Sequence, residues 1–509
     1  MSRLLGRGGA AIVLAVAGLL GAFAVRADGP VPALADCHVA GIVNGVLCGS
    51  MLRPLDPDDP QRGSITVRYV VVPALARRKL ADPVFMLAGG PGQSAIAVAA
   101  QTMPLFSRLN NRRDIVFVDQ RGTGGSAPLL CPNEANESLA EQSDPERQVR
   151  LMQQCKARLL TLPYIHGEAD LGFFTTWIAV RDLDAVRRRL GAGQIDLVGA
   201  SYGTRVGLEY LRQFPQSVRR IVLDGVAPPY MSLPTSFSTD NQAALDKLMA
   251  ACRAEAACSR AHPRLQANLA ALLAGLPKGV DAAPPLTGRV EHFILTHDMV
   301  LDALRGALYV PALAAALPDA IDAAAAGRYD GLLGLDATLF SKKSTRLATG
   351  MNLSVVCAED VPRIALSLAV DPPGTTFGDS FASLYEKLCA VWPRGPVPAA
   401  FYSVGPTRSP ALLLSGGIDP VTPPRHAEQV ARELGPMARQ VIVANAGHGV
   451  MSIGCMRDVV YRFIDAADDA GALRVDAACA AHVPRPPAFV SVGDAVAAAS
   501  AAASGSSAR

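Results

Sequence analysis

The sequence predicts an α/β fold in which a mostly parallel sheet is flanked by helices and carries an inserted, mainly helical cap. Three observations support this prediction. Short apolar runs recur along the chain and are too short for helices, as is typical of strands buried on both faces. Amphipathic helical patterns lie between these runs, and such alternation favours a parallel sheet. One interval, residues 230–400, has Ala/Leu-rich helical patterns but few strand-like runs, which predicts the cap.

The individual elements follow from these patterns in chain order. Residues 28–60 are rich in Pro and Asp and are expected to form an entry segment with an edge strand at 45–51. Residues 64–73 are rich in β-branched side chains, which favours a strand. The remaining strands are predicted at 84–88, 114–118, 195–198, 221–223, 411–414 and 440–443, and helices at 175–190, 202–213 and 424–434.

These elements predict a core in two parts, 28–229 and 401–483, on either side of the cap. The 509-residue length allows one large domain with an insertion. Half of the residues are hydrophobic and only 18% are charged, so general disorder is excluded. Residues 484–509 are of low complexity and are expected to be disordered.

Residues 1–27 have the features of a secretory signal peptide. Arg3 and Arg7 precede an apolar run from residue 10 to 24, and Val25 and Ala27 offer small side chains before a cleavage point. A membrane anchor is the alternative, but a bilayer span needs ~20 apolar residues. Cleavage would leave 45 basic and 45 acidic residues, a balance that argues against nucleic acid as the main partner. We therefore expect an exported protein, periplasmic or secreted, without stable membrane association.

Ten cysteines follow the signal peptide, and an even count in an exported chain predicts disulfides. Many connectivities are possible, and nearest-neighbour pairing is the simplest. A structural zinc site is the alternative, but it would need clustered Cys-x-x-Cys or Cys/His pairs, which the sequence lacks. The expected pairs are Cys37–Cys48, Cys131–Cys155, Cys252–Cys258, Cys357–Cys389 and Cys455–Cys479.

Ser201 is the candidate nucleophile. It lies in Gly199-Ala200-Ser201-Tyr202-Gly203, after a predicted strand and before a predicted helix. A sharp strand-to-helix turn needs small residues two before and two after the serine, and it exposes the hydroxyl beside the N–H groups of the helix N-terminus. A glycine-rich turn without catalytic function is the alternative.

A serine hydroxyl needs a base, and the base needs an acid to orient it. His448 is the candidate base because it lies in a glycine-flanked loop after a late strand. Asp419 is the candidate acid, in a tight turn after the strand at 411–414; the alternative is a carboxylate that only stabilises the turn. The order Ser201, Asp419, His448 is that of the α/β-hydrolases.

Acyl transfer also needs N–H donors for the oxyanion. The N–H of Tyr202, directly after the nucleophile, is one candidate. The loop Gly89-Gly90-Pro91-Gly92 should supply the second, from Gly89 or Gly90, because proline has no N–H. A plain turn is the alternative there. Asp119 and Arg121, after another strand, are expected to tie their loop by a mutual salt bridge rather than to act in catalysis.

Together these segments resemble the proline iminopeptidase and tripeptidyl aminopeptidase family of α/β-hydrolases. The matches extend from about residue 40 to 480, and their order is more specific than any one of them. Many members have His before Gly-Gly-Pro-Gly, whereas this chain has Ala88, which puts substrate fit at that loop in doubt. The matching segments are Gly89 to Gly92, Asp119 to Gly122, Gly199 to Arg205, Gly417 to Pro423 and Gly447 to Gly449.

The resemblance implies a serine exopeptidase that acts near the free N-terminus of peptides and uses no metal or organic cofactor. In such enzymes acidic residues near the cap bind the substrate's ammonium group. Glu359 and Asp360 are the candidates here, and a solvated acidic pair is the alternative. Two other functions stay open: a carboxylesterase or lipase-like hydrolase with the same catalytic groups, and an inactive binding protein on a hydrolase scaffold.

Overall fold

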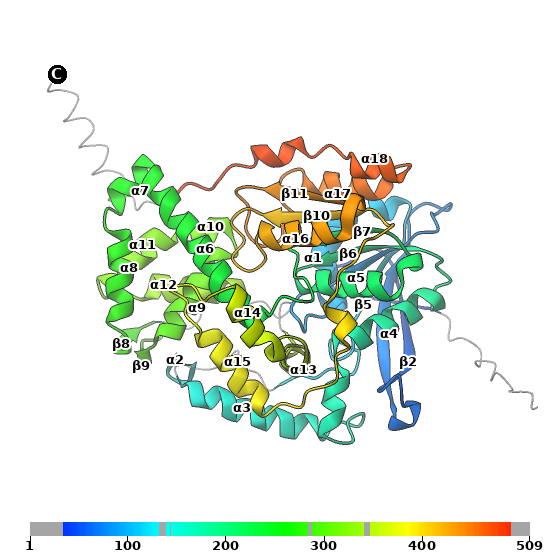
Figure 1. The fold of residues 1–509 in the computed structure, drawn as a ribbon, viewed down its shortest axis with the longest axis horizontal. Coiled ribbons are helices and arrows are strands. Elements are labelled where there is room, and N and C mark those ends of the chain that lie inside the picture. Colours follow the sequence, from blue (N-terminus) through cyan, green and yellow to red (C-terminus); the bar gives the residue numbers. More distant parts are fainter. Residues whose placement is uncertain (1–33, 132–138, 143, 284–287, 341–346, 490–509) are drawn as a thin grey trace, which may run out of the picture.

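The structure of the 509-residue chain is a computed structural model, shown in Figure 1. It describes residues 34–131, 139–142, 144–283, 288–340 and 347–489. The predicted signal peptide, 1–27, and most of the predicted disordered tail, 490–509, lie outside the described residues. Within the described part of the chain, no helix is long and apolar enough to cross a membrane.

One large sheet forms the core. Its strands lie in the order β1-β2-β3-β5-β4-β6-β7-β10-β11; the pairs from β5 to β11 are parallel, and those from β1 to β5 are antiparallel. The strand expected at the edge is β2, which lies second in the sheet because the short β1 pairs outside it. The strands are β1 (Ala35–Cys37), β2 (Val46–Pro54), β3 (Ser64–Val72), β4 (Val84–Leu87), β5 (Ile115–Val118), β6 (Ile195–Ala200), β7 (Val218–Asp224), β10 (Ala411–Gly416) and β11 (Ala438–Val443).

The central strands are buried on both faces, as their unbroken apolar sequences predict. In β4, Phe85 and Leu87 pack into one hydrophobic cluster, and Val84 and Met86 pack into a second one. Successive side chains of a strand point to opposite faces, so these clusters are the two sides of the sheet. The first side is covered by α4 (Thr176–Arg189), α5 (Tyr202–Gln213) and α16 (Pro424–Leu434), and the second by α1 (Ala95–Phe106) and α17 (Met456–Asp465).

Three further helices lie outside the chain between β7 and β10: α2 (Leu139–Gln142), α3 (Pro145–Leu159) and α18 (Asp469–Leu473). The helices predicted at 175–190, 202–213 and 424–434 are confirmed as α4, α5 and α16. The predicted strands are confirmed as well, with ends that differ by up to three residues.

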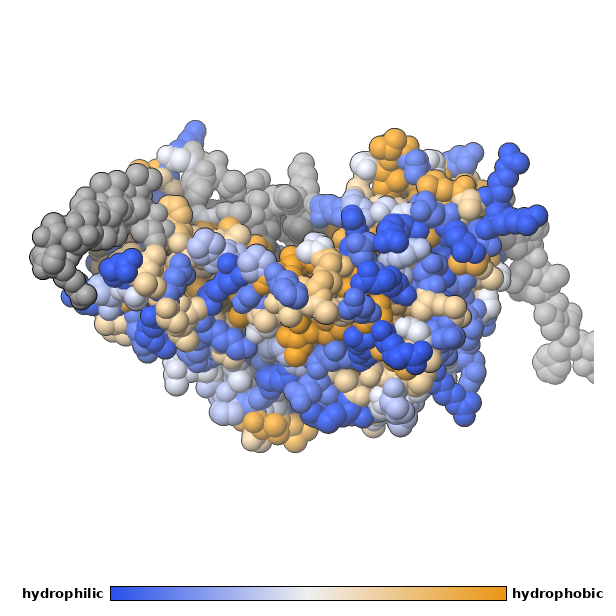
Figure 2. Space-filling model, turned by 90° about the horizontal axis from the view of Figure 1, so that it is seen from above, coloured by the Kyte–Doolittle hydropathy of each residue, from blue (hydrophilic) through white to orange (hydrophobic). Residues whose placement is uncertain are grey.

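The surface seen in Figure 2 is mostly hydrophilic, with hydrophobic residues gathered in separate areas.

The chain between β7 and β10 is the region expected to contain the cap. Most of it packs around a hydrophobic cluster of its own, whereas α13 and α15 contribute Met351, Val355 and Leu388 to a core cluster. Figure 1 shows its helices beside the sheet. Its elements are α6 (Leu233–Ala254), α7 (Ala256–Ala261), α8 (Leu265–Ala274), β8 (Lys278–Ala282), β9 (Glu291–Leu295), α9 (His297–Leu308), α10 (Pro311–Ala314), α11 (Leu317–Ala325), α12 (Asp330–Phe340), α13 (Thr349–Glu359), α14 (Ile364–Val370) and α15 (Ser380–Ala390).

A C-terminal segment, residues 483–489, joins the core to this helical region. The Asn445 side-chain amide donates to the Val483 carbonyl at 2.9 Å, and the Phe489 N–H donates to the Ala315 carbonyl at 2.8 Å. In Figure 1 the segment runs from the end of the sheet that carries β11 towards α10. The expected tail at 484–509 therefore begins with residues that are bonded to the fold.

All five expected disulfides are present: Cys37–Cys48, Cys131–Cys155, Cys252–Cys258, Cys357–Cys389 and Cys455–Cys479. We expect full reduction to lower the melting temperature, because a bond that closes 24 residues removes about 3 kcal/mol of unfolded-chain entropy. The measurement is a thermal melt of the reduced, thiol-blocked protein, with mass spectrometry to count blocked cysteines. An unchanged melting temperature after complete blocking would contradict the stabilising role.

Candidate active site

Ser201 lies at a sharp turn between β6 and α5, as its glycine-flanked sequence predicts. Its backbone has φ 54° and ψ −125°, a conformation that residues other than glycine rarely adopt. The backbone is therefore locally strained at Ser201, as is common at functional sites. A Cβ on Gly199 would lie 2.5 Å from the Gly203 carbonyl oxygen, and one on Gly203 would collide with the Leu87 carbonyl. Both glycines are therefore needed for this turn, which is the geometry of a nucleophile elbow.

His448 and Asp419 form a hydrogen-bonded pair. The distance from His448 Nδ1 to Asp419 Oδ2 is 2.8 Å, and Asp419 is 1% exposed. The backbone N–H groups of Val421 and Thr422 donate to Asp419 Oδ1 at 2.9 Å, and the Thr422 hydroxyl donates to Oδ2 at 2.7 Å. The carboxylate is thus fixed against the imidazole, as a base-orienting acid must be.

Burial disfavours both charged forms, but the pairing outweighs it. For Asp419, the His448 ring and the hydrogen bonds hold the pKa below its usual range despite burial. For His448, burial lowers the pKa, and the charge and hydrogen bond of Asp419, with a further contribution from Asp224, raise it overall. The pair therefore favours the imidazolium that forms when histidine accepts a proton.

The end of β7 lies next to both Ser201 and His448. The Ser201 N–H donates to the Asp224 carbonyl at 2.8 Å. A Cβ on the next residue, Gly225, would lie 3.2 Å from His448 Cε1 and 3.0 Å from Thr422 Oγ1. Ser201 thus lies beside Asp224, and His448 lies beside the next residue, Gly225.

Asp224 and Thr422 are not among the site residues that the sequence predicts. An aspartate before glycine after the apolar run at 221–223 was the available signal for Asp224, since Asp419 also lies in a turn after a strand. Thr422 lies three residues after Asp419 and contacts both members of the pair, because its hydroxyl is also 3.0 Å from His448 Nδ1.

The three candidate oxyanion residues lie around the nucleophile. Tyr202 is the first residue of α5, so its N–H has no acceptor within the helix. A Cβ on Gly89 would lie 3.3 Å from Ser201 Cβ, which places the loop directly beside the nucleophile. The Gly89 N–H donates to the Gln93 side chain at 3.3 Å, and Gly90 has a φ of 113°.

Glu359 and Asp360, the candidate ammonium ligands, are fully buried in a polar network at the end of α13. Asp360 forms a bidentate pair with Arg205, at 3.1 Å for both bonds. Glu359 accepts from the Thr176 N–H at 2.6 Å and from its hydroxyl at 2.9 Å. That hydroxyl is 2.6 Å from the Tyr202 hydroxyl, so Glu359 lies two hydrogen bonds from the residue after the nucleophile. Burial, only partly offset by Arg205, raises the pKa of Glu359 to about 8.

Comparison with known proteins decides the family. The family described as alpha/beta hydrolase fold matches residues 82–453, which contain Ser201, Asp419 and His448. The chain belongs to the alpha/beta hydrolase fold family. It is a serine hydrolase.

Three curated relatives show where the hydrolase lies within this family. It is 26% identical to "Serine protease Hip1" of Mycobacterium bovis, over 77% of this chain and 80% of the relative. It is 29% identical to "Carboxylesterase B" of Mycobacterium tuberculosis, over 76% of this chain and 78% of the relative. It is 33% identical to "Tripeptidyl aminopeptidase" of Streptomyces lividans over 28% of each chain. The resemblance to the proline iminopeptidase and tripeptidyl aminopeptidase family is confirmed.

The expected salt bridge between Asp119 and Arg121 is wrong, although both residues do fix the loop. Arg121 instead forms a bidentate pair with Asp182, at 2.8 and 3.0 Å. Asp119 accepts from the Ser94 hydroxyl at 2.6 Å and from the Gly125 N–H at 2.8 Å. The side chains of Asp119 and Arg121 therefore have different partners, and each one fixes the loop to another part of the hydrolase.

The helical region between β7 and β10 contacts the loops of Asp419 and His448 directly. The His448 N–H donates to the carbonyl of Tyr309, at the end of α9, at 3.0 Å, and the Tyr309 ring packs edge-on against the imidazole with centroids 5.2 Å apart. The Lys247 ammonium of α6 donates to the Gly417 carbonyl at 2.7 Å. The loops of both the acid and the base are thus held by this region.

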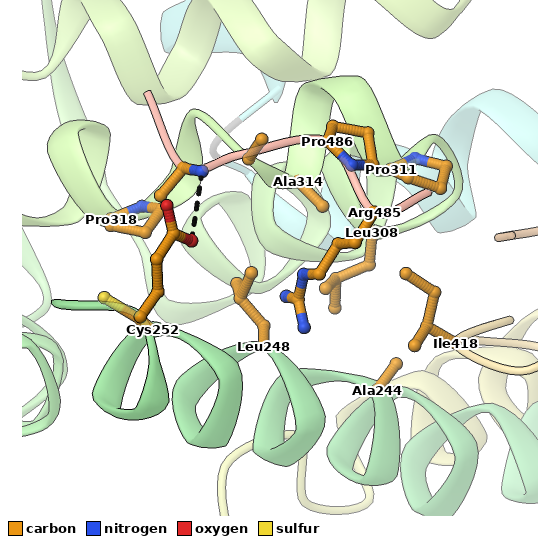
Figure 3. Close-up of a pocket in the computed structure, with 13 residues that line it drawn as sticks. Ala244, Leu248, Cys252, Leu308, Pro311, Ala314, Pro318, Ile418, Arg485 and Pro486 are labelled. Carbon is orange, nitrogen blue, oxygen red and sulfur yellow. Dashed lines mark hydrogen bonds between the residues drawn. The ribbon is translucent and has the colours of Figure 1, made fainter. Parts of the chain in front are cut away.

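A mostly apolar pocket lies behind the acid's loop, where three parts of the hydrolase meet. Ile418, next to Asp419, forms one side, and residues from α6, α9, α10 and α11 form most of the wall. Figure 3 shows Arg485 of the C-terminal segment pointing into it. Glu255, which also lines the pocket, accepts from the Ala488 N–H at 3.5 Å. The C-terminal segment therefore closes one wall of this pocket.

Proposed function

We propose that this chain is an exported serine exopeptidase that hydrolyses amide bonds near the free N-terminus of peptides, of the proline iminopeptidase or tripeptidyl aminopeptidase type. Ser201 attacks the carbonyl carbon, and His448 accepts the hydroxyl proton and later gives it to the leaving amine. Asp419 orients His448. The acyl-enzyme is then hydrolysed by water, which His448 activates in the same way.

The observation that carries this proposal is the strained Ser201 elbow next to the strand end that His448 contacts, with Asp419 fixed at 2.8 Å behind the imidazole. The Tyr202 N–H is one oxyanion donor. We assign the second to Gly90, because the Gly89 N–H is already directed to Gln93. Two preorganised donors in a desolvated site stabilise the charge that develops on the oxygen.

Peptide substrates are supported by the relatives. The protease relative covers most of this chain, and the tripeptidyl aminopeptidase is the most identical of the three over its shorter match. Export is supported by the five disulfides, since such bonds persist in oxidising compartments. As partners we propose peptides with a free N-terminus, and no nucleic acid.

The ammonium site at Glu359 and Asp360 stays a prediction. Asp360 forms the closer pair with Arg205, at 3.1 Å, and Glu359 lies 3.6 Å from the same guanidinium, so Glu359 is the carboxylate better able to respond to a further cation. With a pKa of about 8, Glu359 is mostly protonated at pH 7, and an arriving ammonium group would favour its ionised form. Both side chains have an exposed fraction of 0%, so the amine must displace part of the network to reach them.

A pair of peptide anilides tests the proposal. We expect an anilide with a free N-terminus to be hydrolysed and its N-acetylated form to be left intact, with Ser201→Ala as the blank. Glu359→Gln should raise KM for the free amine while leaving KM for a simple acyl ester unchanged. Equal hydrolysis of both anilides would exclude a free-amine requirement.

A carboxylesterase is the second candidate, because one relative of that name matches over three quarters of this chain. The catalytic groups would be the same, since only the substrate's leaving group differs. Hydrolysis of an acyl ester without hydrolysis of either anilide would establish this alternative instead.

A further inference from the structure

The last residue of β7 is bonded to the elements that carry both the nucleophile and the base. Asp224 pairs in register with Ala200, the residue before Ser201. Its main-chain carbonyl accepts the Ser201 N–H at 2.8 Å, and a Cβ on Gly225, the next residue, would lie 3.2 Å from the His448 ring. The main chain at 224–225 therefore lies beside both the Ser201 backbone and the His448 ring.

The side chain of Asp224 makes a second set of hydrogen bonds, with the loop that follows His448. Both of its carboxylate oxygens accept the Val450 N–H, at 2.9 Å, and one accepts the Met451 N–H, also at 2.9 Å. Val450 and Met451 lie two and three residues after His448, and Asp224 is only 2% exposed. A buried carboxylate thus receives two N–H groups from the loop that carries the base.

We propose that Asp224 is a positioning residue that sets the distance between Ser201 and His448, with its carbonyl holding the nucleophile and its carboxylate holding the loop of the base. The proposal rests on the catalytic triad proposed above, but not on the identity of the substrate. An asparagine of the same shape would present one oxygen and one NH₂ group. The NH₂ group would face a backbone N–H instead of accepting from it, and an unsatisfied buried donor moves or destabilises its surroundings.

Asp224 also places a second negative charge near His448. Among the described residues, the titratable groups that face His448 are Asp419, Asp224 and Tyr309, and the neutral Thr422 hydroxyl lies 3.0 Å from its Nδ1. Burial raises the pKa of Asp224 to about 6. The hydrogen bonds from Val450 and Met451 and the charge of His448 lower this pKa, but they offset the effect of burial only in part. Because the Asp224 charge raises the pKa of His448, its removal should let the neutral imidazole persist to lower pH.

The rate at which a fluorophosphonate labels Ser201 tests this proposal without reference to any substrate. We expect Asp224→Asn to lower the labelling rate by about 100-fold, the loss associated with a displacement of about 1 Å. In the pH profile of the labelling rate, the acidic limb, expected between pH 5 and 8, should also move to lower pH. The matched control is Asp196→Asn. Asp196 is a buried carboxylate near the beginning of β6, at the opposite end of that strand from Ser201, and it accepts from Arg219 at 2.7 Å. The control should keep the wild-type rate and limb.

A second variant separates charge from geometry and serves if Asp224→Asn does not fold. Asp224→Glu keeps the charge but lengthens the side chain, so we expect slower labelling with the limb at its wild-type pH. A wild-type rate in either folded variant would overturn the role of Asp224. Labelling of the wild type without anilide hydrolysis would contradict the peptidase proposal alone. A wild type that is not labelled at all would overturn both, because no reactive serine would exist to be positioned.

Discussion

Ser201→Ala is expected to lower kcat by about 10⁶-fold, the size of loss seen when a serine nucleophile is removed from a hydrolase of this mechanism. The variant keeps a Cβ at the strained turn and loses only the hydroxyl. The melting temperature should therefore stay close to that of the wild type. Activity on the free-amine anilide and a thermal melt measure the two effects.

The control for Ser201→Ala is a buried serine far from the site. Ser409→Ala removes a hydroxyl that donates to the Val218 carbonyl at 2.7 Å, at the beginning of β7 rather than at its end. This variant should lose about 1 kcal/mol of stability and keep its activity. If Ser201→Ala retained most of its activity, Ser201 would not be the nucleophile.

Arg205→Met is expected to lower the free energy of unfolding by about 3–5 kcal/mol at neutral pH. Arg205 is fully buried, and its guanidinium pairs with Asp360 while it also donates to the Met231 carbonyl at 2.8 Å. A methionine of similar length fills the space but leaves the charge of Asp360 without a cationic partner among the described residues, of which only the Leu233 N–H still donates to it, at 3.0 Å. Urea unfolding at pH 7 measures the loss.

The loss in Arg205→Met should depend on pH. The charge of Arg205 lowers the pKa of Glu359, so removal of the guanidinium raises that pKa further, and the folded protein then binds more protons than the unfolded one. Stability of the variant therefore falls more steeply as pH rises, and its deficit against the wild type is smaller at acid pH. Adding Asp360→Asn should restore part of the loss. The control is Arg432→Met, which breaks the exposed pair with Glu428 and should change stability by less than about 1 kcal/mol. A deficit independent of pH would contradict an unpaired buried charge.

The order of strands and helices around the sheet could be predicted because each one depends on local pattern. The runs at 84–88 and 411–414 are apolar without interruption, and only a strand buried on both faces suits such short segments. The disulfide pairs followed from sequence proximity. The Ser201 turn could be predicted because its two glycines are dictated by backbone contacts that any such turn makes.

The partners of buried charges could not be predicted in the same way. Arg121 lies two residues from Asp119 but pairs with Asp182, 61 residues further along the chain. Glu359 and Asp360 were predicted to bind an ammonium group in the cap region, yet the end of α13 packs against the core, where Arg205 and Thr176 hydrogen-bond to them. Asp224 has no motif of its own, and its role depends on loop 450–451, which only the fold brings to it.

The bond between the Tyr309 carbonyl and the His448 N–H bears on how such hydrolases can be re-engineered. Exchanging the region between β7 and β10 for that of another family member would change more than substrate fit, because the incoming segment must also supply a carbonyl at the position of residue 309. A chimera that lacks it would start with a misaligned base. Design of new specificities on this scaffold is therefore better served by substitutions within the native helices than by transplanting a whole segment.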